Sequence, residues 1–220
     1  APLERTVKAR QKTMQIAPLS CRSFEIRGEK GPARTIGIIP GQIITRSLAL
    51  VPRIREGVVL SDPDQDILKM AVVERHRATG NLGLGLVQGF RLEKGALATS
   101  VAHDSHNIIV VGTEDEEMLA AVSAIREMNG GLVAVEEGSV LASLPLPVAG
   151  LLSERYMEEV AEGVEECIDA AQELGCRLED PFMTLSFLSL PVIPELKLTD
   201  RGLVDSADFR LVPIFFGKEF

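Results

Sequence analysis

Short apolar runs separated by turn residues dominate the first half of the chain. Residues 108–111 are four adjacent β-branched residues, which favours a buried strand, and residues 70–73 form a similar apolar run. Two further strands are predicted at residues 35–39 and 43–51, with Pro40 and Gly41 as the turn between them. The pattern therefore predicts a sheet built from short strands.

Glycine alternates with leucine in the stretch that runs from Thr79 to Phe90. Its glycines follow a GxGxxxG spacing rather than the GxGxxG of dinucleotide-binding loops, and no amphipathic helix follows. The alternation instead predicts a strand whose glycine face is crossed closely by another backbone or by a ligand.

Helical periodicity occurs in the second half. A capping box from Thr113 to Glu116 and an apolar stripe at residues 118, 119, 122 and 125 predict a helix over 114–128, which Gly130 and Gly131 end. A hairpin is expected at 132–142, and a long acidic helix, capped by Ser153, over 154–174. Its inner face is expected to hold Met157, Val160, Val164, Cys167, Ile168 and Ala171.

The C-terminal part leaves more open. Residues 181–190 fit a buried helix or a strand equally well, since periodicity cannot separate the two. A turn is predicted at 199–202 and a terminal strand at 211–216. Taken together, the elements predict an α+β fold, a layered sandwich of mixed or antiparallel sheet covered by the 114–128 and 154–174 helices.

Composition suits one globular domain with an arm. The chain has 220 residues, 45% of them hydrophobic and 25% charged, with a formal net charge of −9. Residues 1–33 carry seven Lys/Arg against three Glu, net +4, so the remainder carries net −13 of that total. We therefore expect a basic connector at 1–33 and a domain at 34–220, whose acidic body disfavours nucleic acid as a partner.

Cysteine usage and hydropathy bear on the compartment. Three cysteines without a CxxC pair favour a reducing environment, and a cytoplasmic location is expected. No apolar run approaches the length of a membrane span, and no signal-peptide pattern is present at the N-terminus.

The candidate chemistry is concentrated at two strand ends. The segment 100–107 holds two of the three histidines directly before the 108–111 strand, and the third, His76, lies three residues after the 70–73 strand. If these two strands are neighbours, all three imidazoles meet. The candidate site residues are Glu74, Arg75, His76, Asn81, His103, Asp104, Ser105, His106 and Asn107.

These residue types are compatible with several kinds of chemistry. A three-histidine metal site of His76, His103 and His106, completed by Asp104 or Glu74, would suit zinc, iron or manganese, but no metal is expected here. The alternative is that these histidines have a purely structural role, as hydrogen-bonded groups at the end of a strand. Adjacent His103, Asp104 and Ser105 cannot stack as a serine triad, and the motifs of zinc nucleobase deaminases, H-E-x-x-H and G-x-S-x-G are missing.

Six motifs together resemble the C-terminal domain of bacterial and archaeal adenine deaminase. They are IPGQI at 39–43, AVVERH at 71–76, TGN at 79–81, SVAHDSHNI at 100–108, LPLP at 144–147 and DPFMTLSFL at 180–188. The resemblance extends from about residue 14 to residue 216. It implies membership of the amidohydrolase superfamily, whose metal-binding barrel precedes this segment and is absent from the sequence.

The resemblance also implies a function. The complete enzyme would use manganese or iron in that barrel to hydrolyse adenine to hypoxanthine and ammonia, and would form a homo-oligomer; no cofactor is expected in this chain itself. We expect the chain alone to be inactive, to cap or support the N-terminal amidohydrolase barrel, and to turn its His/Asp/Glu cluster toward purine or a neighbouring domain. A stand-alone, non-catalytic module that binds a purine or a partner protein is the alternative.

Overall fold

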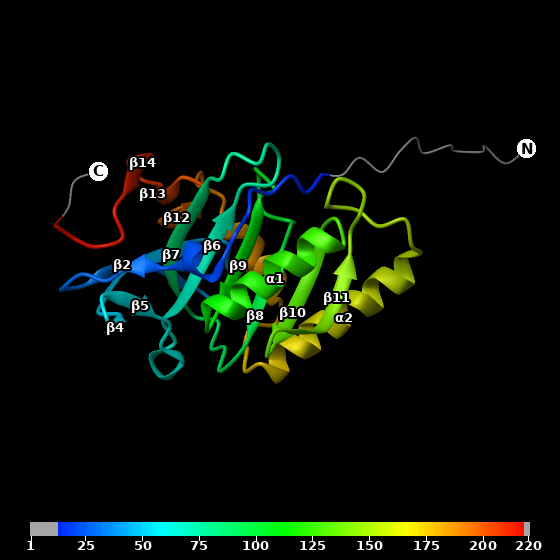
Figure 1. Cartoon of the computed structure of the whole chain (residues 1–220), viewed down its shortest axis with the longest axis horizontal. Helices are drawn as coiled ribbons and strands as arrows, with labels where there is room; N and C mark the ends of the chain where they lie inside the picture. Colours follow the sequence, from blue (N-terminus) through cyan, green and yellow to red (C-terminus); the bar gives the residue numbers. More distant parts are fainter. Residues whose placement is uncertain (1–12, 218–220) are drawn as a thin grey trace, which may run out of the picture.

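The computed structural model describes residues 13–217 and is built around one mixed, eight-stranded sheet (Figure 1). The strands lie in the order β11-β10-β8-β9-β6-β7-β2-β3, and every neighbouring pair is antiparallel except β2 and β7. The bounds are β2 Ala33–Ile38, β3 Thr45–Leu50, β6 Leu68–Val73, β7 Leu82–Gln88, β8 Ala96–Thr99, β9 Ile108–Gly112, β10 Gly131–Glu136 and β11 Ser139–Pro145. The predicted α+β class and the mixed sheet are confirmed.

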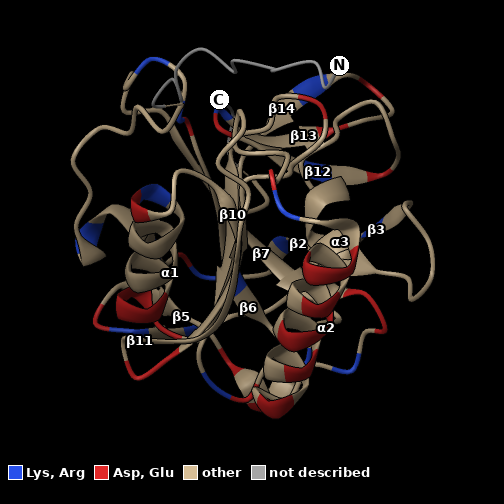
Figure 2. Cartoon of the chain, turned by 90° about the vertical axis from the view of Figure 1, so that its right-hand side faces the viewer, with Lys and Arg blue, Asp and Glu red and all other residues tan. Residues whose placement is uncertain are grey.

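Helices cover both faces of this sheet (Figure 2). On one face lies α1, Asp115–Glu127, which buries Met118, Val122 and Ile125. On the other face lie α2, Met157–Glu173, and α3, Pro181–Phe187. The layered sandwich predicted from the two helical stripes is therefore confirmed, and the segment 181–190, left open between helix and strand, begins with a helix.

The central strands are buried on both faces, which explains their continuous apolar runs. In β6 all six residues are buried; Met70 and Val72 pack on the α2 side, while Ala71 and Val73 pack on the α1 side. Because successive side chains of a strand point to opposite faces, β6 contributes to the hydrophobic cores on both sides of the sheet.

Two smaller sheets flank the large one. The first contains β1, Ile26–Arg27, β5, Val58–Leu60, and β4, Arg53–Arg55; the second contains β12, Leu196–Thr199, β13, Gly202–Asp205, and β14, Arg210–Val212. Two short 3₁₀ helices, η1 at Cys21–Phe24 and η2 at Pro63–Gln65, complete the described elements. The terminal strand is shorter than the predicted 211–216.

The glycine face of β7 is crossed by another backbone, as its pattern predicted. A Cβ on Gly83 would lie 1.8 Å from the carbonyl oxygen of Thr199, the last residue of β12. Gly85, on the same face, would bring its Cβ to 3.3 Å from Leu203. Only glycine allows the hairpin to approach this closely.

Both predicted helix caps are wrong. The Thr113 hydroxyl donates to the carbonyl oxygen of Gly95 at 3.2 Å, because the end of β9 brings that carbonyl within reach, and α1 starts without a side-chain cap. The Ser153 hydroxyl accepts from the Arg155 amide at 3.1 Å in a local turn, and α2 begins only at Met157. Met157 consequently faces solvent, 79% exposed, rather than the core.

The segment before β2 packs on the α1 face of the sheet. Met14, Ile16 and Phe24 are buried there, and the Gln15 amide donates to the Arg75 carbonyl at 2.8 Å. The predicted connector also contains the short strand β1. Residues 1–12 of that connector lie outside the described part of the chain.

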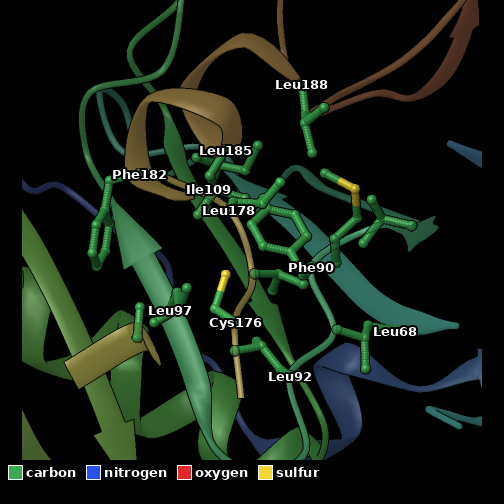
Figure 3. Close-up of a cluster of buried hydrophobic side chains, with 14 of the residues drawn as sticks. Leu68, Phe90, Leu92, Leu97, Ile109, Cys176, Leu178, Phe182, Leu185 and Leu188 are labelled. Carbon is green, nitrogen blue, oxygen red and sulfur yellow. The ribbon is translucent and has the colours of Figure 1, made fainter. Parts of the chain in front are cut away.

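The cysteines are free thiols, two of them in the core. Cys176 lies among Phe90, Leu92 and Leu97 on the α2 side of the sheet (Figure 3), and Cys167 is buried on the inner face of α2 as predicted. Burial, assisted by the negative charge of Glu166, raises the pKa of Cys167 to about 12. Both residues therefore serve packing. Among the described helices, none has the length and apolarity needed to cross a membrane.

Candidate functional site

The two strands that carry the histidine motifs are direct neighbours. Antiparallel pairing of β6 with β9 sets Val73 opposite Ile108, so the chain leaving β6 and the chain entering β9 run side by side. The His76 ring nitrogen Nε2 lies 2.8 Å from the carbonyl oxygen of Ser105. The predicted convergence of all three histidines at one strand end is confirmed.

His103 is positioned by α3. Its amide donates to the Ser186 carbonyl at 3.0 Å, and its carbonyl accepts from the Ser189 hydroxyl at 3.1 Å. Its ring lies 4.6 Å from the ring of Phe187 and 5.6 Å from that of His106, measured between centroids. The histidine segment is therefore attached to a helix more than 70 residues away in sequence.

His106 is held as a neutral imidazole. Its Nδ1 accepts from the Ala102 amide at 3.3 Å, which leaves the proton of the neutral ring on Nε2. Burial lowers the pKa of His106, and the charges of His103 and Arg75 lower it further, whereas Asp104 opposes them. Its backbone is left-handed, with φ of 50°, a conformation that a side chain bearing a β-carbon adopts at some cost.

Glu74 faces inward and closes the loop that follows β6. Its carboxylate accepts from the amides of His76 at 2.5 Å, Arg77 at 2.8 Å and Thr79 at 2.9 Å, and from the Thr79 hydroxyl at 2.9 Å. Burial alone would raise the pKa of Glu74, but these hydrogen bonds outweigh burial and lower it. Glu74 is thus an ionised anchor for the loop.

Arg75 joins three separate segments beneath the cluster. Its side chain is 2% exposed and donates to the carbonyl oxygens of Thr13 at 3.3 Å, Ala149 at 3.0 Å and His106. The Arg75 amide in turn donates to the side-chain oxygen of the buried Asn107 at 3.4 Å. Planar guanidinium groups suit such divergent contacts because they carry five donors in a fixed arrangement.

The remaining candidates are exposed. His76, Asn81, Asp104 and Ser105 all face outward, and the Asn81 side chain donates to Asp200 at 3.1 Å, in the turn between β12 and β13. The nine predicted residues thus form two groups. Glu74, Arg75 and Asn107 build the frame. The other six lie at or near the surface: His76, Asn81, His103, Asp104, Ser105 and His106.

The donor geometry does not favour a three-histidine metal site. Within residues 13–217, no three His, Cys, Asp or Glu side chains come together as a metal-binding group. His76 Nε2 and His106 Nδ1 are both directed at backbone groups, Ser105 and Ala102 respectively. The described residues therefore do not fit a metal ion at this cluster.

Several residues around the cluster were not singled out from the sequence. Phe187 contacts His103, and the fully buried Lys197 donates to the carbonyls of Ile43 at 2.7 Å and Phe187 at 3.2 Å. Burial lowers the pKa of Lys197 to about 8. A lysine between two leucines in an otherwise apolar strand was the available signal, but its partners are distant in sequence.

A cavity of about 480 Å³ lies beside Phe187, between the 40–43 turn and α3. Its polar wall consists of Gln42, Arg177, Glu179, Asp180 and Thr184. A larger cavity, about 920 Å³, surrounds Lys69 and Asp115 at the start of β6 and of α1, at the other end of the sheet from the histidines. Of these two cavities, the smaller one adjoins the histidine cluster through Phe187, whose ring contacts His103.

The fold and the cluster define an α+β domain whose mixed sheet gathers polar, histidine-bearing loops at one end. The family model described as the adenine deaminase C-terminal domain matches residues 42–210. The chain belongs to this family.

Curated relatives support the same assignment. An adenine deaminase of Methanothrix thermoacetophila is 58% identical over 90% of this chain and 35% of its own length. Adenine deaminases of Desulfatibacillum aliphaticivorans and Dehalococcoides mccartyi are 55% and 49% identical, over 87% and 96% of this chain. The chain spans about a third of the length of these relatives.

Proposed function

We propose that this chain is the C-terminal part of an adenine deaminase, which hydrolyses adenine to hypoxanthine and ammonia. The observation that carries the proposal is the match of the chain, over most of its length, to about a third of proteins named adenine deaminase, together with the match to the family model of their C-terminal domain. One water is consumed and one ammonia released, with the exocyclic nitrogen of adenine as the leaving group.

The metal chemistry of such an enzyme is assigned to the part that precedes this chain. The described residues provide no converging set of three ligands, so we derive no step through a metal here. Manganese or iron in an N-terminal amidohydrolase barrel remains the expectation from family resemblance. A cytoplasmic homo-oligomer is likewise part of the proposal, and the free cysteines agree with a reducing compartment.

The role proposed for this chain is to support the barrel and to present its histidine cluster toward purine or the adjoining domain. A neutral His106 can donate from Nε2 to a purine ring nitrogen, and the exposed carboxylate of Asp104 can accept from an amino group. Glu74 and Arg75 keep these groups in place and act as positioning residues.

An assay of adenine conversion tests the proposal. The chain alone, the chain mixed with a separately made N-terminal barrel, and the full-length protein would each be supplied with manganese or iron. We expect hypoxanthine from the full-length protein and from the mixture, and none from the chain alone. Conversion by the isolated chain would reveal an autonomous enzyme, and an inactive full-length protein would remove the proposed reaction.

A further inference from the structure

The loops of five strands meet at the end of the sheet that carries the histidines. Val73 pairs with Ile108, Thr99 with Leu132, and Gly131 with Pro145, so β6, β8 and β11 end where β9 and β10 begin. The Ser100 hydroxyl ties these loops together, since it donates to the Gly150 carbonyl at 2.6 Å and accepts from the Gly131 amide at 2.8 Å. The loop between β11 and α2 therefore lies beside the histidine cluster.

Three large apolar side chains of this region are directed into solvent. Leu152 is 63% exposed, Tyr156 80% and Met157 79%, all within six residues of one another. We call Leu152, Tyr156 and Met157 the loop-end patch; Figure 1 shows this stretch where the chain passes from β11 into α2. Clustered apolar exposure at a sheet end is typical of a surface that another protein part covers.

The patch stands on an ordered support. Leu152 and Val148 exchange backbone hydrogen bonds at 3.0 and 3.1 Å, and the carbonyl of Ala149 accepts from Arg75 at 3.0 Å. Exposure of Leu152 is therefore set by a fixed turn, and Met157 is exposed because it opens the first turn of α2.

Thr13, the first residue that the structure describes, lies beside the same loop. Thr13 donates its amide to the Asn129 side chain at 3.1 Å, and its carbonyl accepts from Arg75, the residue that also holds Ala149. In the relatives, about two thirds of the protein lies outside the region that this chain matches, and the family is that of a C-terminal domain. Arg75 thus holds Thr13 beside the turn that carries Leu152.

We infer that the loop-end patch is the docking surface for the N-terminal domain of the full-length protein. This inference rests on the proposed function only in naming that domain as the partner. Docking there buries Leu152, Tyr156 and Met157 and brings the neighbouring domain against the exposed His76, Asp104 and Ser105. The histidine cluster then lies at the boundary between the two domains.

Hydrogen–deuterium exchange tests this surface without depending on activity. Peptides covering residues 148–160 would be compared between the 220-residue chain and the full-length protein. Covered backbone opens less often, so we expect exchange slowed at least about tenfold in the full-length protein, with no change at residues 50–57. Equal exchange of residues 148–160 in both proteins would overturn the inference.

Matched variants identify the cause of the protection. Leu152→Asp in the full-length protein is expected to restore fast exchange at residues 153–160, whereas Val51→Asp, at a residue 64% exposed, is expected to leave it slow. Retained protection of β6 peptides shows that each variant is folded. Equal loss of protection in both variants would contradict a specific docking surface.

Two further outcomes separate the explanations. Protection that disappears on dilution, with a change from dimer to monomer mass, would assign the patch to a second copy and overturn the inference. Adenine conversion by the same full-length sample is measured separately. If the enzyme is active but residues 148–160 are unprotected, only the docking inference is refuted. If it is inactive but these residues are protected, only the proposed reaction is refuted.

Discussion

The Nε2 atom of His76 lies 2.8 Å from the carbonyl oxygen of Ser105, although 29 residues separate them in sequence. This contact follows from the pairing of β6 with β9, which sets Val73 opposite Ile108. It makes the two histidine motifs one structural unit, so a substitution in one loop is expected to alter the conformation of the other.

Replacement of Arg75 by Met is expected to lower the free energy of unfolding by about 3 kcal/mol. The change leaves the carbonyls of Thr13, His106 and Ala149 without their common donor in a buried place. Urea unfolding followed by circular dichroism measures the effect. Arg77→Met, at the exposed neighbour, is the control and should change stability by less than about 0.5 kcal/mol. Equal effects of both variants would show that the buried guanidinium is dispensable.

Replacement of Glu74 by Gln is expected to lower stability by about 1–2 kcal/mol at pH 7, because four donors converge on an ionised carboxylate. The pKa of Glu74 is lowered in the folded state, so its contribution is present above the unfolded value near 4.5 and disappears as the pH falls through the folded value. The difference between wild type and variant should therefore shrink toward pH 3. Glu56→Gln, at a side chain that is 86% exposed, is the control. A pH-independent difference would contradict this account.

The pKa of His106 is lowered on folding, which predicts a loss of stability in mild acid. In the unfolded chain this imidazole binds a proton at the ordinary histidine pKa of 6.5, while the folded protein resists protonation. Stability is therefore fully present above pH 6.5 and falls as the pH drops through the folded pKa. His106→Asn keeps a residue that tolerates the left-handed backbone and does not titrate. Between pH 7.5 and pH 5.5 the free energy of unfolding should fall less in the variant than in the wild type. An equal decrease in both proteins would contradict the prediction.

Gly83→Ala is expected to be far more damaging than Gly85→Ala. A methyl group at 83 meets the Thr199 carbonyl oxygen at 1.8 Å, so the β12–β13 hairpin must move, at a cost of about 3 kcal/mol or more. At 85 the contacts of 3.3–3.4 Å involve leucine side chains, which can shift. Thermal unfolding of the two variants compares them directly. Similar melting temperatures would mean that the hairpin adapts freely.

Alanine substitution of His103 and His106 in the full-length protein tests the proposed contact with substrate. If the cluster faces purine, kcat/KM for adenine is expected to fall by about 100-fold, in the range typical of lost acid–base or recognition groups. Unfolding curves for each variant show whether the fold persists. A folded double variant with unchanged turnover and unchanged affinity for adenine would restrict these histidines to a structural role.

Local patterns alone predicted a large part of the architecture. The apolar runs located β6 and β9, the glycine alternation predicted the close crossing over β7, and the helical stripes located α1 and α2. These features depend on residues near one another in the chain, whose periodicity matches the geometry of the element they form. The predicted Thr113 cap of α1 is wrong because the Thr113 hydroxyl donates instead to the carbonyl oxygen of Gly95, which is distant in sequence.

What the sequence by itself determined is the class of fold, the family and the set of polar residues at two strand ends. Only the tertiary structure decided which of those residues are anchors and which face outward. Glu74 and Arg75 resemble candidate catalytic groups in the sequence, yet they point inward because amides and carbonyls from the 76–79 loop and from residues 13, 106 and 149 surround them. Hydrogen-bond partners of a buried polar group come from whichever segments the fold brings together, and no local pattern specifies them.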